Sequence, residues 1–436
     1  MEEIFEPECQ YNDVLTSSTK TFLCKNSSFL PGQDLFSIEI PPQELWLDFS
    51  SAVLCMKFSI VKKNGEKLKE EECGDFSIIN AIGKTFVKTL EVSCQNDKII
   101  RHAQLDYRSY INLTLTETKN SLGWAQSSLT FMDAHGGFNN FTEKENRGWE
   151  YRRAYVKASK PVRTIAKLDC FPFNIGQPMP PGISFNFDFY RNTDEFCLLG
   201  AAALDPIIKV DEFELRVDVI KPVTLASELA FKNFSLGKVA KYPFNQVVLE
   251  NHSIPKDKSL YRIEFNRNRA MRPNVIIYGF VEETAFLGSK TENPFSFKHH
   301  DIENIQIKCG EKLVYQPDLK LDFGSGDYLN AYWGLIKELG YTESDTNLFF
   351  TRNSYDNDYV FFAANIQNCV DSEAKSISNE AGDANQIDII LRFKNVLTKN
   401  LRLIIYGIYD NLCTVSLVDE EGRKNQRKIV KLNQVF

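Results

Sequence analysis

Hydrophobic and polar residues alternate with a period of two along several segments of the chain. Every second residue from 183 to 189 is apolar and the residues between are polar, and the same holds from 213 to 219. Because successive side chains of a strand point to opposite faces, this pattern predicts β-strands with one buried and one wet face. Such strands are typical of antiparallel β-sandwiches.

Two segments of the second half break this alternation. Residues 275–281 and 401–409 are almost continuously apolar, which indicates strands that are covered on both faces. Two interpretations remain open for these runs. The second half carries more of a domain or subunit interface than the first, or its core is locally thicker.

The apolar segments of the first half recur in the second half, in the same order and about half a chain apart. The pairs are residues 35–40 with 260–265, 53–58 with 275–280, 90–94 with 305–309, 106–113 with 327–335, 183–192 with 387–395, and 213–220 with 401–408. Short apolar strands resemble one another by chance, but six in register order indicate a duplicated β-domain.

One helix is predicted in each copy, at residues 106–115 and 327–339. In both, an Asp that could cap the helix precedes Tyr and Leu residues spaced three or four apart. Two polar insertions differ between the copies. Residues 116–149 are expected to hold a small core of their own, and residues 371–386 are expected to form a surface loop.

The boundary between the copies is predicted between a strand that ends near Pro222 and one that begins near Tyr242. We therefore expect an N-terminal arm at 1–30, a first domain at 31–225, a second domain at 226–418 and a basic tail at 419–436. Each domain of about 200 residues is long enough to bury a core without disulfides or metals.

Composition narrows the classes of function. The chain has 436 residues, 33 of them Phe, and a net charge of −7, which argues against non-specific binding of nucleic acid by the whole surface. No apolar run approaches the ~20 residues of a membrane helix, and the N-terminus lacks a signal-peptide pattern. The 10 cysteines form no Cys-x-x-Cys pair, as expected for reduced thiols in a protein made in the cytosol or nucleus.

The search for catalytic chemistry nominates no residue. No nucleophile elbow, Walker loop or dinucleotide-binding glycine triplet is present, and the five histidines include no His-x-His pair. His299 and His300 on a strand would point to opposite faces, so a structural role is expected for both. We assign no catalytic, cofactor-binding or metal-binding residue and expect no cofactor.

Several motifs resemble one protein family across most of the chain, from about Leu35 to Ser416. They are residues 179–183 (MPPGI), 189–198 (FYRNTDEFCL), 242–244 (YPF), 285–289 (AFLGS), 293–299 (NPFSFKH) and 406–410 (YGIYD). These runs resemble the major capsid proteins of Polintons (Mavericks) and adintoviruses. The stretch from Gly288 to Phe297 is the most specific part. The chain departs from the family at residues 95–97, where a turn glycine is expected, and in the insertion at 116–149.

The resemblance implies an all-β fold of two tandem jelly-roll β-sandwiches, a double jelly-roll, with one short helix per domain. It implies a structural capsid (hexon) protein and no enzyme, forming pseudo-hexameric homotrimers that tile an icosahedral shell. The implied partners are the chain itself and then penton and minor capsid proteins, with no sequence-specific nucleic acid; an internal membrane is left open. The implied location is the virion capsid, after synthesis in the host cytosol and assembly in cytoplasm or nucleus, without secretion. An endogenous viral element would carry the same fold.

Two other classes of protein compete with this interpretation. A hydrolase of the peptide N-glycanase type also pairs two jelly-rolls and would hold acidic residues at the seam between them. A carbohydrate-binding β-sandwich would need exposed aromatic residues, for which Trp124, Trp149 and Trp333 are candidates. We expect these tryptophans instead to anchor loops and the helix into the core.

Overall fold

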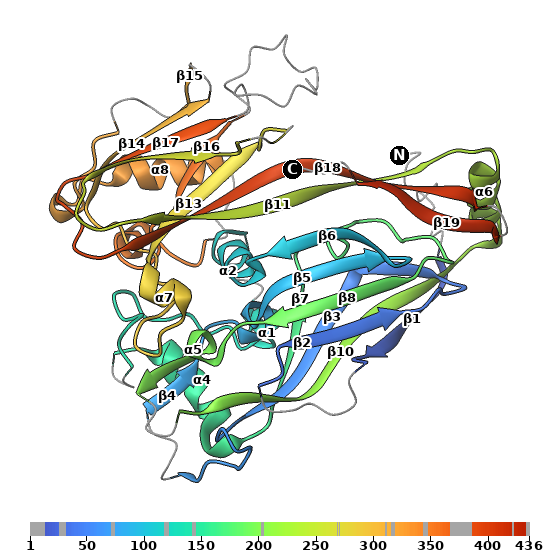
Figure 1. The fold of residues 1–436 in the computed structure, drawn as a ribbon, viewed down its shortest axis with the longest axis horizontal. Coiled ribbons are helices and arrows are strands. Elements are labelled where there is room, and N and C mark those ends of the chain that lie inside the picture. The colour runs from blue at the N-terminus through green and yellow to red at the C-terminus, as the bar shows by residue number, and fades with distance from the viewer. Residues whose placement is uncertain are drawn as a thin grey trace, which may run out of the picture.

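A computed structural model of the chain shows two β-sandwiches joined side by side (Figure 1). It describes residues 14–25, 32–70, 75–116, 122–141, 145–201, 205–267, 269, 271–309, 312–314, 319–342, 348–366, 386–420 and 423–432. Most buried apolar side chains of both sandwiches belong to one contiguous core. No helix in these ranges is both long and apolar enough to cross a membrane.

The first sandwich contains two four-stranded antiparallel sheets. One has the order β1 (Val14–Leu23), β10 (Ile207–Pro222), β3 (Trp46–Val61) and β7 (Val162–Lys167). The other has the order β2 (Leu35–Ile40), β8 (Phe185–Arg191), β5 (Val87–Cys94) and β6 (Asp97–Ala103). Aromatic rings join the two sheets: Phe36 stacks on Phe213 at 4.6 Å, and Phe49 meets Phe185 edge to face at 4.9 Å. The alternating segments at 183–189 and 213–219 thus supply opposite walls of one core.

The second sandwich repeats this plan. One sheet has the order β11 (Ala240–Ile254), β18 (Leu401–Glu420), β13 (Val275–Glu282) and β16 (Phe362–Asn365), with β19 (Arg423–Leu432) also paired to β18. The facing sheet has the order β12 (Leu260–Phe265), β17 (Ile387–Phe393), β14 (Ile302–Cys309) and β15 (Lys312–Leu313). Phe280 of the first sheet contacts Phe393 of the second, with ring centroids 5.6 Å apart.

Both sandwiches have the same strand order. We number the eight strands that both halves share from 1 to 8 in chain order. In each half, one sheet then has the strand order 1-8-3-6 and the other has the order 2-7-4-5. This is the order of a jelly-roll, so the chain is a double jelly-roll. The six recurrences found in the sequence fall on equivalent elements, and the predicted duplication is confirmed. An extra sheet of β4 (Asp75–Ile78) and β9 (Leu198–Ala201) belongs to the first half only.

The helix predicted in each copy is present, and the connections add further helices. The predicted pair is α2 (Leu105–Thr116) and α8 (Leu329–Glu338). The connections hold further short helices, namely α1 (Ile82–Thr85), α3 (Leu122–Gln126), α4 (Arg147–Val156), α5 (Asp194–Cys197), α6 (Thr224–Ser235), α7 (Glu283–Leu287) and α9 (Arg352–Tyr355). Single-turn 3₁₀ helices lie at Lys157–Ser159 and Phe323–Ser325. Local caps allow such short turns: Thr193 accepts a hydrogen bond from the Phe196 amide at the start of α5.

The capping role predicted for the two aspartates is wrong. Asp106 lies inside the first turn of α2, where its carboxylate accepts from the Tyr107 amide and from Asn192 Nδ2. The N-cap of α8 is Tyr328, which makes no side-chain capping bond, and the backbone of Asp327 pairs with Asp322 instead. Asp106 therefore bonds to an amide of its own first turn and also ties α2 to Asn192, which follows β8.

Both ends of the chain carry strands where an arm and a tail were expected. β1 lies within residues 1–30 and pairs with β10 from Val14 opposite Pro222 to Leu23 opposite Glu214. β19 lies within residues 419–436 and pairs with β18. Without β1 and β19, the long strands β10 and β18 would each expose a row of unpaired amide and carbonyl groups at an edge. The two terminal strands pair with these groups. The insertion at 371–386 lies outside the described residues, except for Gln386.

The turn at residues 95–96 is tight although it lacks the glycine of the family. Gln95 and Asn96 have φ angles of 49° and 70°, and Cys94 pairs directly with Asp97. Two consecutive positive φ angles are the signature of a type I′ hairpin turn, which matches the twist of the flanking strands. The departure from the family pattern at residues 95–97 thus leaves the β5–β6 hairpin intact.

The two ends of the molecule differ in character (Figure 1). α4, α5 and α7 lie close together in the lower left part of this view. α6, which joins β10 to β11, lies at the opposite end beside β19. β10 ends at Pro222 and β11 begins at Ala240, so the strand ends predicted from the sequence hold.

Candidate functional site at the seam between the two halves

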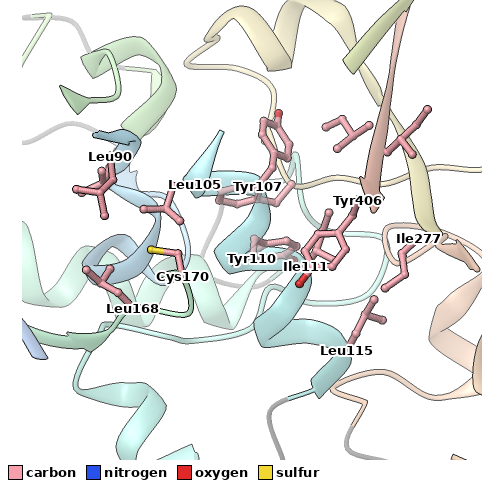
Figure 2. Packing of buried hydrophobic residues seen from close by; sticks show 14 of the residues in the cluster. Leu90, Leu105, Tyr107, Tyr110, Ile111, Leu115, Leu168, Cys170, Ile277 and Tyr406 are labelled. Carbon is pink, nitrogen blue, oxygen red and sulfur yellow. The ribbon is translucent and has the colours of Figure 1, made fainter. Parts of the chain in front are cut away.

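The seam between the jelly-rolls is built from α2 of the first half and one face of β13 and β18 of the second. Ile111 and Leu115 of α2 point toward Ile277 and Tyr406 (Figure 2). Ile277 and Tyr406 lie opposite each other in the β13–β18 ladder, and both are buried. The first half therefore covers the outer face of the second half's sheet.

This arrangement explains the continuous apolar runs of β13 and β18. Phe280 points into the second jelly-roll, where it contacts Phe393 of the facing sheet, and its ladder partner Leu403 shares that face. Ile277 points the other way, toward α2. The interpretation as a domain interface is confirmed, and a thicker local core is not needed to explain the pattern. A subunit interface on these strands remains a prediction.

Aromatic rings from both halves fill the centre of the seam. Tyr110 of α2 stacks on Phe295 at 4.2 Å with an interplanar angle of 6°, and Tyr107 stacks on Phe286 at 5.5 Å. A Cβ atom at Gly279 would come within 2.7 Å of the Phe297 ring, so β13 needs glycine at this position. The motif NPFSF, which ends the most specific stretch of the family resemblance, thus supplies rings that meet α2.

A buried polar cluster links the insertion of the first half to the same motif. Arg152 Nη2 lies 2.6 Å from Asp133 Oδ1, and the two side chains are 0% and 1% exposed. Asn146 Nδ2 donates to Asp133 Oδ1 at 2.9 Å, and Asn293 Nδ2 donates to Asp133 Oδ2 at 3.2 Å. Arg152 Nε donates to the Ile78 carbonyl. We call Asp133, Arg152, Asn146 and Asn293 the Asp133 cluster. Its two charges neutralise each other within the first half, and the neutral Asn293 amide links the cluster to the second half.

Two other buried carboxyl groups lie near the seam, each with a neutral donor. Ser296 Oγ donates to Asp358 Oδ1 at 2.6 Å, and burial raises the pKa of Asp358. Asn192 Nδ2 donates to Asp106 Oδ2 at 2.9 Å, and burial raises the pKa of Asp106 to about 6. A raised carboxyl pKa is also found in general acids, but these groups sit among packed side chains.

A cavity of about 460 Å³ opens at the seam between α2, β11 and β18. Its polar lining includes Arg108, Lys167, Asp169 and the ring of Tyr406. Arg108 donates through Nη2 to the Asp169 carbonyl and through Nη1 to the Val247 carbonyl, so it joins the halves. Asp169 is the one carboxylate among the described lining residues. The described lining of this cavity therefore presents a single acidic residue, whereas the hydrolase hypothesis places a set of them at the seam.

The histidines flagged in the sequence have structural surroundings. His299 and His300 lie in the connection before β14 and not on a strand, because His300 has a left-handed φ of 46°. His299 stacks on Phe323 at 4.4 Å and accepts from the Asp301 amide through Nδ1. Within the described part of the chain, no group of three or more His, Cys, Asp or Glu side chains could hold a metal ion.

Buried histidines predict loss of stability in acid. Burial lowers the pKa of His102 and of His300 to about 3, below the ordinary 6.5, so both fold as neutral rings. The contribution of these neutral rings to the free energy of unfolding is complete above pH 6.5 and is lost as the pH falls toward 3. Asp106 acts in the opposite sense between pH 6 and 3.8, because its raised pKa favours the protonated folded state. For these three groups together, we expect the free energy of unfolding to fall by about 2–3 kcal/mol from pH 7 to pH 5.

Urea unfolding at pH 7, 6 and 5 measures this loss. His102, whose Nε2 lies 2.9 Å from the Phe171 carbonyl, provides the control. Because glutamine does not titrate, His102→Gln should remove about half of the histidine contribution to the pH dependence. A stability that stays constant from pH 7 to pH 5 would contradict the assignment of both rings as buried and neutral.

The three tryptophans named as candidates divide into one anchor and two surface residues. Trp149 of α4 is buried and donates through Nε1 to the Leu199 carbonyl, as expected. Trp124 of α3 and Trp333 of α8 are 44% and 52% exposed, so the expectation that they anchor the core is wrong. In α8 the buried face is formed by Ala331, Leu335 and Ile336, and Trp333 lies on another face.

Comparisons with known proteins agree on the fold and reach further in structure than in sequence. No described protein family matches the chain. An uncharacterized protein of Caenorhabditis elegans is 32% identical over 85 residues, which span 19% of this chain and 19% of the relative.

Solved capsid structures match over almost the whole length. The Sputnik virophage structure has a TM-score of 0.59 at 10% identity, covering 94% of this chain and 90% of that one. The PBCV-1 Vp54 structure has a TM-score of 0.55 at 9% identity, with coverages of 96% and 97%. The mavirus major capsid protein has a TM-score of 0.52 at 10% identity, with coverages of 94% and 90%. At these identities the likeness establishes the fold that this chain shares with capsid proteins of virophages and a giant virus.

Proposed function

We propose that this chain is a structural major capsid (hexon) protein of the Polinton or adintovirus type. The observation that carries the proposal is the pair of topologically equivalent jelly-rolls locked together by the seam. The capsid structures of the same fold and the sequence motifs of the family support it. The role requires no catalysis.

The geometry suits a homotrimer with a pseudo-hexameric outline. Three chains with two equivalent jelly-rolls each present six similar lobes, although the true symmetry is threefold. A contact between the first jelly-roll of one copy and the second jelly-roll of the next is heterologous and closes into a ring. The packed seam holds the two lobes of each chain in one orientation, which a regular ring requires. We propose that such trimers tile an icosahedral virus-like shell with penton and minor capsid proteins.

The proposed domains follow the sequence boundaries, with the terminal strands added. Residues 31–225 form the first jelly-roll together with β1, and residues 226–418 form the second together with β19. The proposed location is the virion capsid, after synthesis in the host cytosol.

Light scattering of the purified chain at several concentrations tests the proposal. Three chains of 50.0 kDa each give 3 × 50.0 = 150 kDa, so we expect a trimer of that mass that does not dissociate on dilution. Such permanence is expected because interfaces of obligate oligomers are large and apolar. A monomer at every concentration would contradict the proposal.

A further inference from the structure

The connection between the two jelly-rolls contains a helix whose apolar residues are left uncovered. α6 has 12 residues, of which Phe234 alone is buried. Leu225 is 65% exposed, Leu229 52% and Leu236, the C-cap residue, 65%. An isolated helix of this length is marginal in water, and most surface helices gain their stability by burying their apolar face.

The exposed leucines share one side of α6. Residues of an α-helix are 100° apart, so Leu225, Leu229 and Leu236 fall within about 40° of one another. Phe234 is nine residues from Leu225, which places it about 180° away, on the side turned toward the protein. The helix ends in an ordered cap, since Gly237 has a φ of 75° and the Lys238 amide donates to the Asn233 carbonyl. The leucines therefore project outward from a well-formed helix.

This end of the molecule is basic, although the chain as a whole has a charge of −7. Residues 221–241 contain four lysines, Lys221, Lys232, Lys238 and Lys241, and one acidic residue, Glu228, for a net charge of 4 − 1 = +3. All four lysines are exposed. β19 lies at the same end (Figure 1), and its sequence holds five basic residues and no acidic one. Three acidic residues, 419–421, precede β19 in the sequence.

Outward leucines interspersed with lysines fit a lipid surface better than a protein or a nucleic acid. Lys232 lies about 20° from Leu225 around the helix, at the margin of the leucine stripe, and lysine is depleted from protein–protein interfaces. Exposed leucines have no role in binding phosphate backbones, which is driven by charge. A helix that combines an apolar stripe with lysines is typical of segments that lie in the interface of an anionic membrane.

We propose that α6 binds the surface of a membrane that contains anionic phospholipids. Leu225, Leu229 and Leu236 enter the boundary between headgroups and acyl chains, while Lys232 and Lys238 contact lipid phosphates. Both jelly-rolls then stand on the membrane through the segment that joins them. This interaction does not depend on the capsid role.

Flotation of the full chain with vesicles tests the proposal. The chain should float with vesicles of phosphatidylcholine and phosphatidylserine, but not with phosphatidylcholine alone, and less in high salt because salt screens the lysines. Leu225→Ser combined with Leu229→Ser should lower the bound fraction about tenfold or more. Lys232→Glu combined with Lys238→Glu should do the same.

Exposed leucines elsewhere provide the matched control. Leu260 is 55% exposed and Leu287 67%, so Leu260→Ser with Leu287→Ser removes as much surface leucine without touching α6. This variant should float like the unmodified chain. Equal flotation of the α6 variants would overturn the proposal, and so would failure of the unmodified chain to float with either vesicle. If the chain does not float but the double serine variant of α6 dissociates its oligomer, the face is a contact between copies and the lipid assignment is wrong.

Discussion

Replacing Ile405 with Asp is expected to prevent the chain from folding to a stable native state. Ile405 lies on β18 opposite Tyr278 and is completely buried. The substitution removes an apolar contact and places a carboxylate without a partner in the core, which together exceed about 4 kcal/mol. Urea unfolding, or soluble yield where no folded protein remains, measures the effect. Ile277→Asp should also be severe, because Ile277 lies against α2 in the seam.

Asn186→Lys is the matched control on the solvent-facing side of a strand. Asn186 lies on β8 between two buried phenylalanines, is partly exposed, and donates to Asp188. A lysine there keeps a charged end in water near a carboxylate, so we expect a change within about 0.5 kcal/mol. Equal tolerance of substitutions at 405, 277 and 186 would show that the buried faces have been assigned to the wrong side of the strands.

Removing the carboxylate of the Asp133 cluster is expected to have the second largest effect. Asp133→Ala leaves the Arg152 guanidinium buried without its anion and removes the acceptor of Asn146 and Asn293. Breaking a buried ion pair in this way costs about 3–5 kcal/mol. Urea unfolding measures the loss, and limited proteolysis should show faster cleavage around residues 130–150 because the insertion loses one of its hydrogen bonds to the second half.

Two further variants separate the ion pair from a general effect of substitution. Glu212→Ala removes an anion that pairs with Lys57 and Arg163 on the surface, where screening by water makes the loss small. Asp133→Leu combined with Arg152→Met replaces both charges with apolar groups and should recover a large part of the stability lost in Asp133→Ala. The role assigned to the cluster is wrong if Asp133→Ala and Glu212→Ala are equally mild.

The duplication could be predicted because the alternation of apolar and polar residues within single segments reveals it. The strands around Phe187 and Val217 alternate cleanly, and their counterparts recur in order in the second half. The pairing order of the strands is not local, since β1 and β10 are neighbours although Leu23 and Glu214 are far apart in sequence. The jelly-roll itself was therefore implied by the family resemblance and not by periodicity. Helices of four residues, such as α1 and α5, are too short to show a helical period.

The seam was only partly predictable. The apolar run of β13 indicates that both faces are covered, but nothing in it names α2 as the cover. The Asp133 cluster was missed because Asp133, Asn146 and Asn293 look like ordinary loop residues, and 293 − 133 = 160 positions separate the two ends of one hydrogen bond. The signal that could have pointed to it is the NPFSF motif, whose Asn and Phe residues reach the first half together.

The ring stack between Tyr110 and Phe295 has a consequence for inheritance. After a duplication, two copies can diverge freely only as long as neither depends on the other. Here the first copy supplies α2 and the second copy supplies the rings that pack on it. The stability of each copy therefore depends on side chains of the other. A genetic crossover within residues 223–239 between two diverged relatives would separate these matched parts. We expect the two halves to be inherited together, and recombinants with a break there to be rare among functional genes.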